Sequence, residues 1–108
     1  MPTFDDFEAL AIRAGTVLRA EPNTGSRHPA IKLWIDFGDL GELQSSARIT
    51  DRYGPEGLIG RQVVAVTGFP SMRVGGFRSD VLVLGATTDD GVILLNIDSD
   101  VPPGSVVA

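Results

Sequence analysis

Turn-forming residues recur along this chain at intervals too short for long helices. The sequence contains 13 glycines and 7 prolines among 108 residues, and the segments between them are rich in valine, isoleucine and leucine. Residues 30–37 show the resulting pattern most clearly, because Ile31 and Leu33 alternate with Lys32 and Trp34. A period of two is typical of a half-buried strand. The sequence therefore predicts an all-β fold built from short strands.

The same alternation of apolar segments and turn-forming residues predicts strands, loops and turns along the rest of the chain. Main strands are expected at residues 11–20, 30–37, 42–49, 62–69 and 77–86, with a further apolar strand at 92–97. Loops are expected at 21–29 and 70–76 and a turn at 87–91, where Gly, Pro or Asp cluster. In the first strand, alternation separates two sets of side chains: Ile12, Ala14, Leu18 and Ala20 on one face, and Arg13, Val17 and Arg19 on the other.

Two short helical segments accompany the strands. Thr3 and Asp6 have the spacing of a capping box, which predicts one or two helical turns over the DDFEAL segment. The polar stretch 49–60 predicts a turn or short helix between the third and fourth strands. Residues 101–108 are expected to form an edge-like tail. Five strands that close on themselves form a small Greek-key barrel, and the OB-fold is the commonest form of it.

Chain length and strand composition bear on domain organisation. A chain of this length is expected to form one domain, here residues 1–108.

The segment 62–69 is apolar on both faces, as expected of a strand that is buried on both sides. One face fills the barrel, so a partner subunit or the terminal segments must cover the other. The pattern therefore predicts a homodimer.

Charge is distributed unevenly. The formal net charge is −5, which argues against a general nucleic-acid binder. All nine basic residues, however, lie between residues 9 and 79, and eight of them are arginine. Two interpretations stay open: acidic ends that keep the domain soluble, or a local basic surface suited to phosphate or carboxylate contacts.

Several classes of function lack the residues they need. With no cysteine and one histidine, the chain offers no zinc ribbon and no thiol nucleophile. His28 has no triad partner nearby in sequence, and Ser45 and Ser46 lack a nucleophile-elbow setting. There is no apolar run long enough for a membrane span and no basic leader segment, so we expect a cytoplasmic protein without membrane insertion. No enzyme activity, cofactor or metal is expected.

Four segments together resemble a known family: Ile12-x-x-Gly15, HPAIKLWIDFG (28–38), QSSARI (44–49) and residues 57–85, with the pattern FP-x-x-x-x-x-G-F-x-S-x-V-L-x-LG. They are similar to the tRNA-binding OB domain attached to methionyl-tRNA synthetases and found as free-standing tRNA-binding proteins. The N-terminal helix and the QSSA segment resemble more closely still the CsaA family of export-related chaperones.

The resemblance implies a homodimeric OB-fold protein that binds folded tRNA by shape and phosphate contacts. Motif matching assigns RNA-binding roles to Lys32, Ser45, Ser46, Met72, Arg73, Arg78 and Ser79, and proximity in the chain adds Arg27, Gln44 and Arg48. The serines keep a structural alternative, because strand hydroxyls often satisfy backbone groups of a barrel.

The CsaA resemblance implies an alternative function, namely a chaperone for unfolded or presecretory polypeptides in which tRNA binding is weak or vestigial. Its apolar candidates are Trp34, Met72, Val74 and Phe77. For Trp34 two interpretations stay open. The residue either packs under a terminal segment or a partner subunit, or it forms an exposed platform for a base or a peptide side chain.

Overall fold

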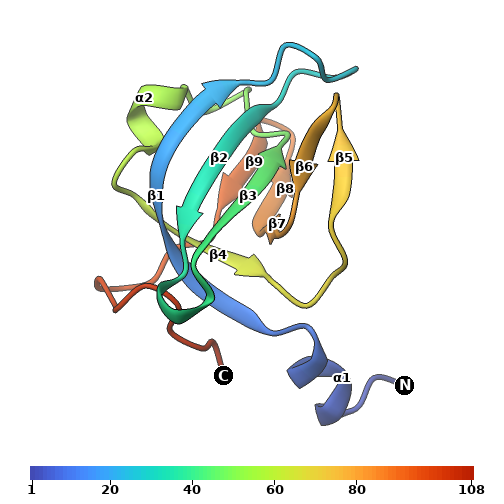
Figure 1. Cartoon of the computed structure of the whole chain (residues 1–108), viewed down its shortest axis with the longest axis vertical. Coiled ribbons are helices and arrows are strands. Elements are labelled where there is room, and N and C mark those ends of the chain that lie inside the picture. The colour runs from blue at the N-terminus through green and yellow to red at the C-terminus, as the bar shows by residue number, and fades with distance from the viewer.

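The computed structural model describes residues 1–108 and is built around one curled antiparallel sheet (Figure 1). Its strands follow the order β3-β2-β1-β4-β7 and form a nearly closed barrel, with β3 and β7 in contact. The strand bounds are β1 Ile12–Pro22, β2 Ile31–Asp36, β3 Glu42–Ala47, β4 Gln62–Val66 and β7 Leu82–Val83. The predicted all-β, OB-like architecture is confirmed.

Two small hairpins and three short helical segments complete the fold. The hairpins are β5 Met72–Val74 with β6 Phe77–Ser79, and β8 Gly85–Thr88 with β9 Gly91–Leu94. The helices are α1 Phe4–Ala9 and α2 Pro55–Leu58, with a 3-10 turn at Gly38–Leu40. Helix α1 begins at the predicted capping box, in which the Thr3 N–H donates to the Asp6 carboxylate at 2.8 Å and the Asp6 N–H donates to the Thr3 hydroxyl at 3.2 Å. Helix α2 lies between β3 and β4, as predicted.

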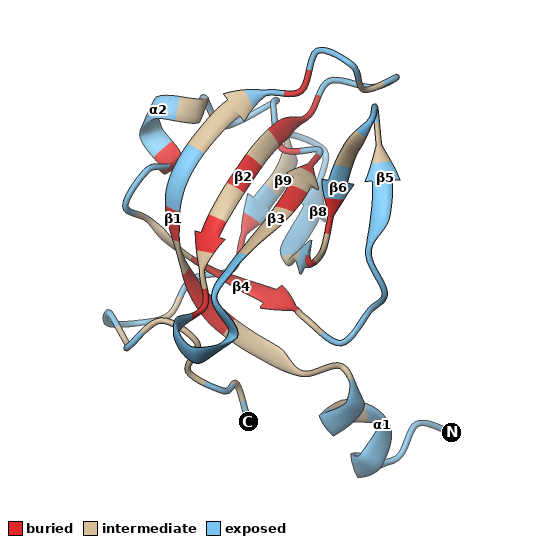
Figure 2. Cartoon of the chain, in the orientation of Figure 1, coloured by how far each residue is buried: buried red, intermediate tan, exposed pale blue.

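The core lies inside the barrel, and Figure 2 shows much of β2 and most of β4 in red, the colour of buried residues. Leu33 and Ile35 on β2 and Phe37 directly after it are each 0% exposed, while the intervening residues are half-buried. The alternation predicted for this strand is confirmed. Strand β4 is buried on both faces from Val63 to Val66, also as predicted. Burial of these apolar side chains is the main stabilising contribution to the fold.

The face assignment predicted for β1 is wrong in its middle. Val17 is 1% exposed and belongs to the core, whereas Leu18 is 48% exposed. The register shifts between Val17 and Arg19, so Leu18 is the extra residue of a β-bulge. A bulge shifts every following side chain by one position. Beyond it Ala20 packs against the core and Arg19 points outward.

The predictions for residues 70–86 also need correction. The expected loop at 70–76 contains β5, because Gly75 and Gly76 adopt φ values of 60° and 79°. Those angles permit a tight hairpin turn, in which Val74 pairs with Phe77. The expected single strand 77–86 is divided into β6, β7 and β8. It breaks at Asp80, whose backbone N–H donates to the Gln44 carbonyl of β3 at 2.7 Å.

The C-terminal tail lies along the start of β1, as its edge-like pattern predicted. Val106 forms an isolated antiparallel bridge with Arg13, and the Val107 N–H donates to the Ile12 carbonyl at 2.9 Å. None of the helices is both long enough and apolar enough to cross a membrane.

Candidate nucleic-acid interface

The loop 23–30 and the β5–β6 hairpin pack against each other beside the outer face of β2. Asn23, 4% exposed, holds them together: its side-chain amide donates to the Ser46 hydroxyl at 3.0 Å and to the Val74 carbonyl at 3.1 Å. At the tip, a Cβ on Gly25 would lie 2.6 Å from the Gly75 carbonyl oxygen. We call the surface formed by this loop, the outer side of β2 and the hairpin the hairpin face.

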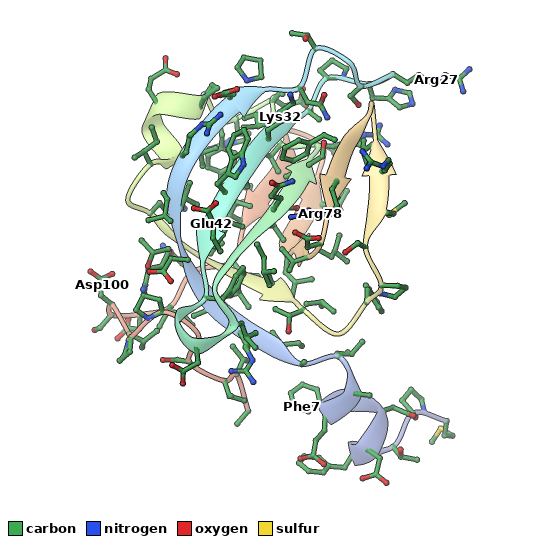
Figure 3. The ribbon with its side chains drawn as sticks, viewed as in Figure 1. Phe7, Arg27, Lys32, Glu42, Arg78 and Asp100 are labelled. Carbon is green, nitrogen blue, oxygen red and sulfur yellow. The ribbon has the colours of Figure 1, made fainter.

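Basic side chains gather on the hairpin face. Arg27 lies on the loop, Lys32 on β2, and Arg73 and Arg78 on the hairpin, where the two arginines are register partners. Figure 3 shows Arg27 and Lys32 near the top of the molecule and Arg78 below them, with Asp100 of the C-terminal segment at the left edge and the acidic helix α1 at the bottom. Like charges directly opposite on a hairpin repel each other, so this pair favours a negative charge close by.

One of these cations is already balanced. The Arg78 Nε lies 2.8 Å from the Asp80 carboxylate, which also accepts hydrogen bonds from the Gln44 N–H and the Ser71 hydroxyl. Partial burial raises the pKa of Asp80. The hydrogen bonds from Gln44, Ser71 and Arg78 and the charge of Arg78 outweigh it, so the pKa lies below its ordinary value. Asp80 therefore stays ionised and fastens β6 to β3.

The other cations of the hairpin face have no such counter-charge. The structure contains ion pairs at Arg19–Glu21 and Arg78–Asp80 only. The Arg73 guanidinium donates to the Gly76 carbonyl at 2.9 Å, within its own hairpin. Arg27, Lys32 and Arg73 thus present positive charge that no carboxylate within 4.0 Å compensates.

The predicted polar residues on β3 serve mainly to attach the hairpin. Ser45 is 2% exposed and its hydroxyl donates to the Val81 carbonyl, while Ser79, 8% exposed, accepts from the Ser46 N–H. Both hydroxyls satisfy backbone groups, which favours the structural alternative for them. The Gln44 side chain donates to the Arg78 carbonyl at 2.9 Å. Arg48, in contrast, is exposed beside β8 and β9, away from the hairpin.

Two aromatic rings, one from β2 and one from β6, meet where the hairpin lies beside β2. Trp34 packs edge-on against Phe77 with ring centroids 5.3 Å apart, and the Lys32 Nζ lies 5.1 Å from the Phe77 centroid. The Arg19 guanidinium carbon lies 3.9 Å from the Trp34 centroid. Neither ring neighbour of Trp34 belongs to a terminal segment. The sequence pattern did not single out Arg19, because only the bulge in β1 makes it the register partner of Trp34.

The apolar candidates for peptide binding fall in two places. Met72 and Val74 line a groove of about 270 Å³ below the hairpin, together with Phe69, Pro70, Val81 and Leu82. Trp34 and Phe77 instead pack against each other on the hairpin face. Asn23 was missed as a site-building residue, and its position in the polar segment PNTG gave no sign that it is buried. No group of three or more His, Cys, Asp or Glu side chains could hold a metal ion anywhere in the structure.

Comparison with known proteins agrees with this geometry. Residues 12–106 match the family model described as "Putative tRNA binding domain". The methionine–tRNA ligase of Methanothrix thermoacetophila is 40% identical over 101 residues, which cover 94% of this chain and 15% of the ligase. The chain therefore spans only about 15% of the length of this curated relative.

Solved structures cover the whole chain. The chaperone CsaA from Bacillus anthracis is 51% identical, with a TM-score of 0.92, and the match covers 100% of this chain and 99% of that one. The CsaA chaperone from Picrophilus torridus is 42% identical, with a TM-score of 0.93 and 100% of both chains covered. The resemblance drawn from the sequence motifs is confirmed: this chain belongs to the tRNA-binding domain family, as a CsaA-like member.

Proposed function

We propose that this protein binds folded tRNA through the hairpin face, by shape and by phosphate contacts. The observation that carries the proposal is the group of uncompensated cations, Arg27, Lys32 and Arg73, which lie on the loop, on β2 and on β5 of the hairpin face. Arginine and lysine contacts to phosphates position an RNA without reading its bases. Folded RNA is recognised largely by shape. The hairpin, fastened to the barrel by Asn23 and Asp80, keeps these charges at fixed separations.

The salt dependence of tRNA binding tests this proposal. Labelled tRNA is titrated at several salt concentrations against the wild type, Arg73→Ala and the control Arg61→Ala. Arg61 is a half-buried cation that lies 5.2 Å from the Tyr53 ring, outside the hairpin face. Removing the neutralisation of one phosphate reduces the slope of log K against log salt by about 0.7–0.9. We expect that reduction for Arg73→Ala and not for Arg61→Ala.

A comparison of the two hairpin arginines sharpens the test. Arg78→Ala is expected to weaken tRNA binding less than Arg73→Ala does, because Asp80 already balances the Arg78 charge. Equal affinity and equal slope in the wild type and both variants would remove the hairpin from the RNA-binding site.

The groove below the hairpin favours a second candidate function, the binding of unfolded or presecretory polypeptide. Phe69, Met72 and Leu82 at this groove are 48%, 64% and 50% exposed. Exposed apolar side chains around one concavity suit apolar side chains of a polypeptide. Met72→Ser should weaken binding of an unfolded polypeptide, with little dependence on salt. The control Leu40→Ser changes an exposed apolar residue outside the groove. Equal polypeptide affinity in the two variants would contradict the groove as the site.

We also propose that the protein forms a homodimer through helix α1 and the C-terminal tail. No residue of α1 is buried, and Phe4 is 71% exposed. A six-residue helix is not stable in isolation, so it needs a packing partner. Phe4, Phe7, Ile12 and Val106 line a groove of about 210 Å³ between helix and tail, which a second copy would cover. Light scattering should give twice the mass of the chain for the wild type and the single mass for Phe4→Glu. A wild-type monomer would refute the proposal.

A further inference from the structure

The only tryptophan of the chain is covered by an arginine held in a fixed position. Arg19 of β1 and Trp34 of β2 are register partners, and the guanidinium carbon lies 3.9 Å from the indole centroid. At this separation the planar cation is in van der Waals contact with the ring. Cation–π contacts of this kind are strongest with tryptophan.

Glu21 fixes the orientation of the Arg19 guanidinium. Its Oε2 accepts from the Arg19 Nε at 2.9 Å and lies 2.8 Å from a terminal guanidinium nitrogen. The Arg19 side chain nevertheless remains 59% exposed. The guanidinium is therefore held against Trp34 and is still open to solvent on its outer side.

The indole ring is fixed from a second direction. Phe77 of β6 packs edge-on against Trp34 at 5.3 Å with an interplanar angle of 76°, and Lys32 lies over Phe77. Contributions from β1, β2 and β6 thus produce a continuous row: Arg19, Trp34, Phe77 and Lys32. A preorganised row loses little conformational entropy when a ligand binds to it.

The charge of Arg19 distinguishes it from Arg73. Because Glu21 already balances Arg19, this guanidinium is a weak phosphate ligand, and a second anion would meet the Glu21 carboxylate. Its flat surface is still available. Unstacked RNA bases pack on arginine planes and aromatic rings, and such stacking tolerates any base. The chemistry of this location therefore suits a base rather than a phosphate.

We propose that Arg19 and Trp34 form a stacking platform for one unpaired nucleobase of the bound RNA. The base lies on the open side of the Arg19 guanidinium, and Lys32 is close enough along the row to meet a neighbouring phosphate. This inference rests on the proposed RNA-binding function and adds to it a specific site for an unstacked base. Glu21 acts as a positioning residue.

The test combines Trp34 fluorescence with a substitution of Arg19 that keeps the positive charge and removes the planar guanidinium group. Arg19→Lys is compared with the wild type and with Arg61→Lys, which makes the same exchange at the Arg61–Tyr53 contact. Thermal unfolding confirms that each variant is folded. Binding of labelled tRNA is followed by anisotropy, which does not depend on Trp34. Separately, hexa-adenylate is compared with an abasic hexamer of equal charge.

In the wild type, tRNA and hexa-adenylate should change the Trp34 emission, and hexa-adenylate should bind about 5- to 100-fold more tightly than the abasic hexamer. Arg19→Lys should abolish this preference and weaken tRNA binding while leaving the salt slope unchanged. Arg61→Lys should behave as the wild type.

Other outcomes overturn the platform in distinguishable ways. Salt-dependent tRNA binding with unchanged Trp34 emission and no effect of Arg19→Lys would refute the platform and leave the proposed function intact. No salt-dependent tRNA binding at all would refute both. A Trp34 response to an unfolded polypeptide but not to RNA would reassign the row to peptide binding.

Discussion

The barrel and the β5–β6 hairpin are held in place by different forces. The barrel encloses Leu33, Ile35 and Phe37, all 0% exposed, among other apolar side chains. The hairpin is attached through a few directed polar contacts, made by Asn23, Gln44 and Asp80, and one aromatic contact between Phe77 and Trp34. Apolar burial is additive and insensitive to direction, whereas a hydrogen-bonded attachment depends on each of its members. The part of the molecule that carries the candidate site can therefore be loosened without unfolding its support.

The largest expected change in the free energy of unfolding comes from a substitution in the barrel. Phe37→Ala removes a fully buried ring and should lower the free energy of unfolding by about 3–5 kcal/mol. Urea denaturation measures the change. Leu40→Ala, at a position 43% exposed, serves as the control and should alter it by less than about 0.5 kcal/mol. A similar small loss for both variants would contradict the assignment of the core.

Asn23→Ala should act mainly on the hairpin. The substitution leaves the Val74 carbonyl without its donor, at a cost of about 1–3 kcal/mol. Hydrogen exchange of residues 72–79 should accelerate more than that of β2 and β4. Thr24→Ala, an exposed neighbouring change, is the control. Equal acceleration in barrel and hairpin would show that the two regions unfold together.

Asp80 makes the hairpin sensitive to acid. Its lowered pKa in the folded state means that the carboxylate contributes stability above the unfolded-state pKa of about 4. This contribution is lost as pH falls through the lower folded-state pKa. Asp80→Asn should therefore destabilise the protein by about 1 kcal/mol at pH 7 and progressively less below about pH 4. Denaturation at several pH values checks this, and a difference that stays constant with pH would contradict it.

The smallest effect on stability is expected at Arg73. Arg73→Gln should change the free energy of unfolding by less than about 0.5 kcal/mol, because the side chain is exposed and its one contact lies within its own hairpin. Thermal denaturation measures it. A larger loss would mean that Arg73 supports the hairpin, and its binding role would then need a separate demonstration.

Local patterns predicted most of the barrel. The alternation of β2, the fully apolar β4, the capping box at Thr3 and the helix before β4 all follow from neighbouring residues. The bulge at Leu18 does not, because an apolar residue in an alternating strand gives no sign that it is extra. The hairpin was missed because the glycines that predicted a loop also permit a tight turn between paired strands.

The candidate site was predictable from the sequence only in part. Motif matching identified Lys32 and Arg73 as candidate RNA-binding residues. Whether a nearby carboxylate compensates each positive charge depends on the folded structure. Both ion pairs, Arg19–Glu21 and Arg78–Asp80, have the i, i+2 spacing that puts side chains on one face of an extended segment, so this signal was available. Nothing local indicated that Asn23 would be buried between β3 and β5.

By itself the sequence determined the strand content, the inward face of β2, the burial of β4 on both faces and the family to which the chain belongs, because these depend on short-range periodicity and on motifs. Only the tertiary structure decided that Arg19 lies on Trp34, that Asp80 cancels the charge of Arg78 and leaves Arg73 uncompensated, and that Ser45 is enclosed. Each of these outcomes depends on strand register and on contacts between segments far apart in the chain, and one inserted residue, Leu18, is enough to change which side chains meet.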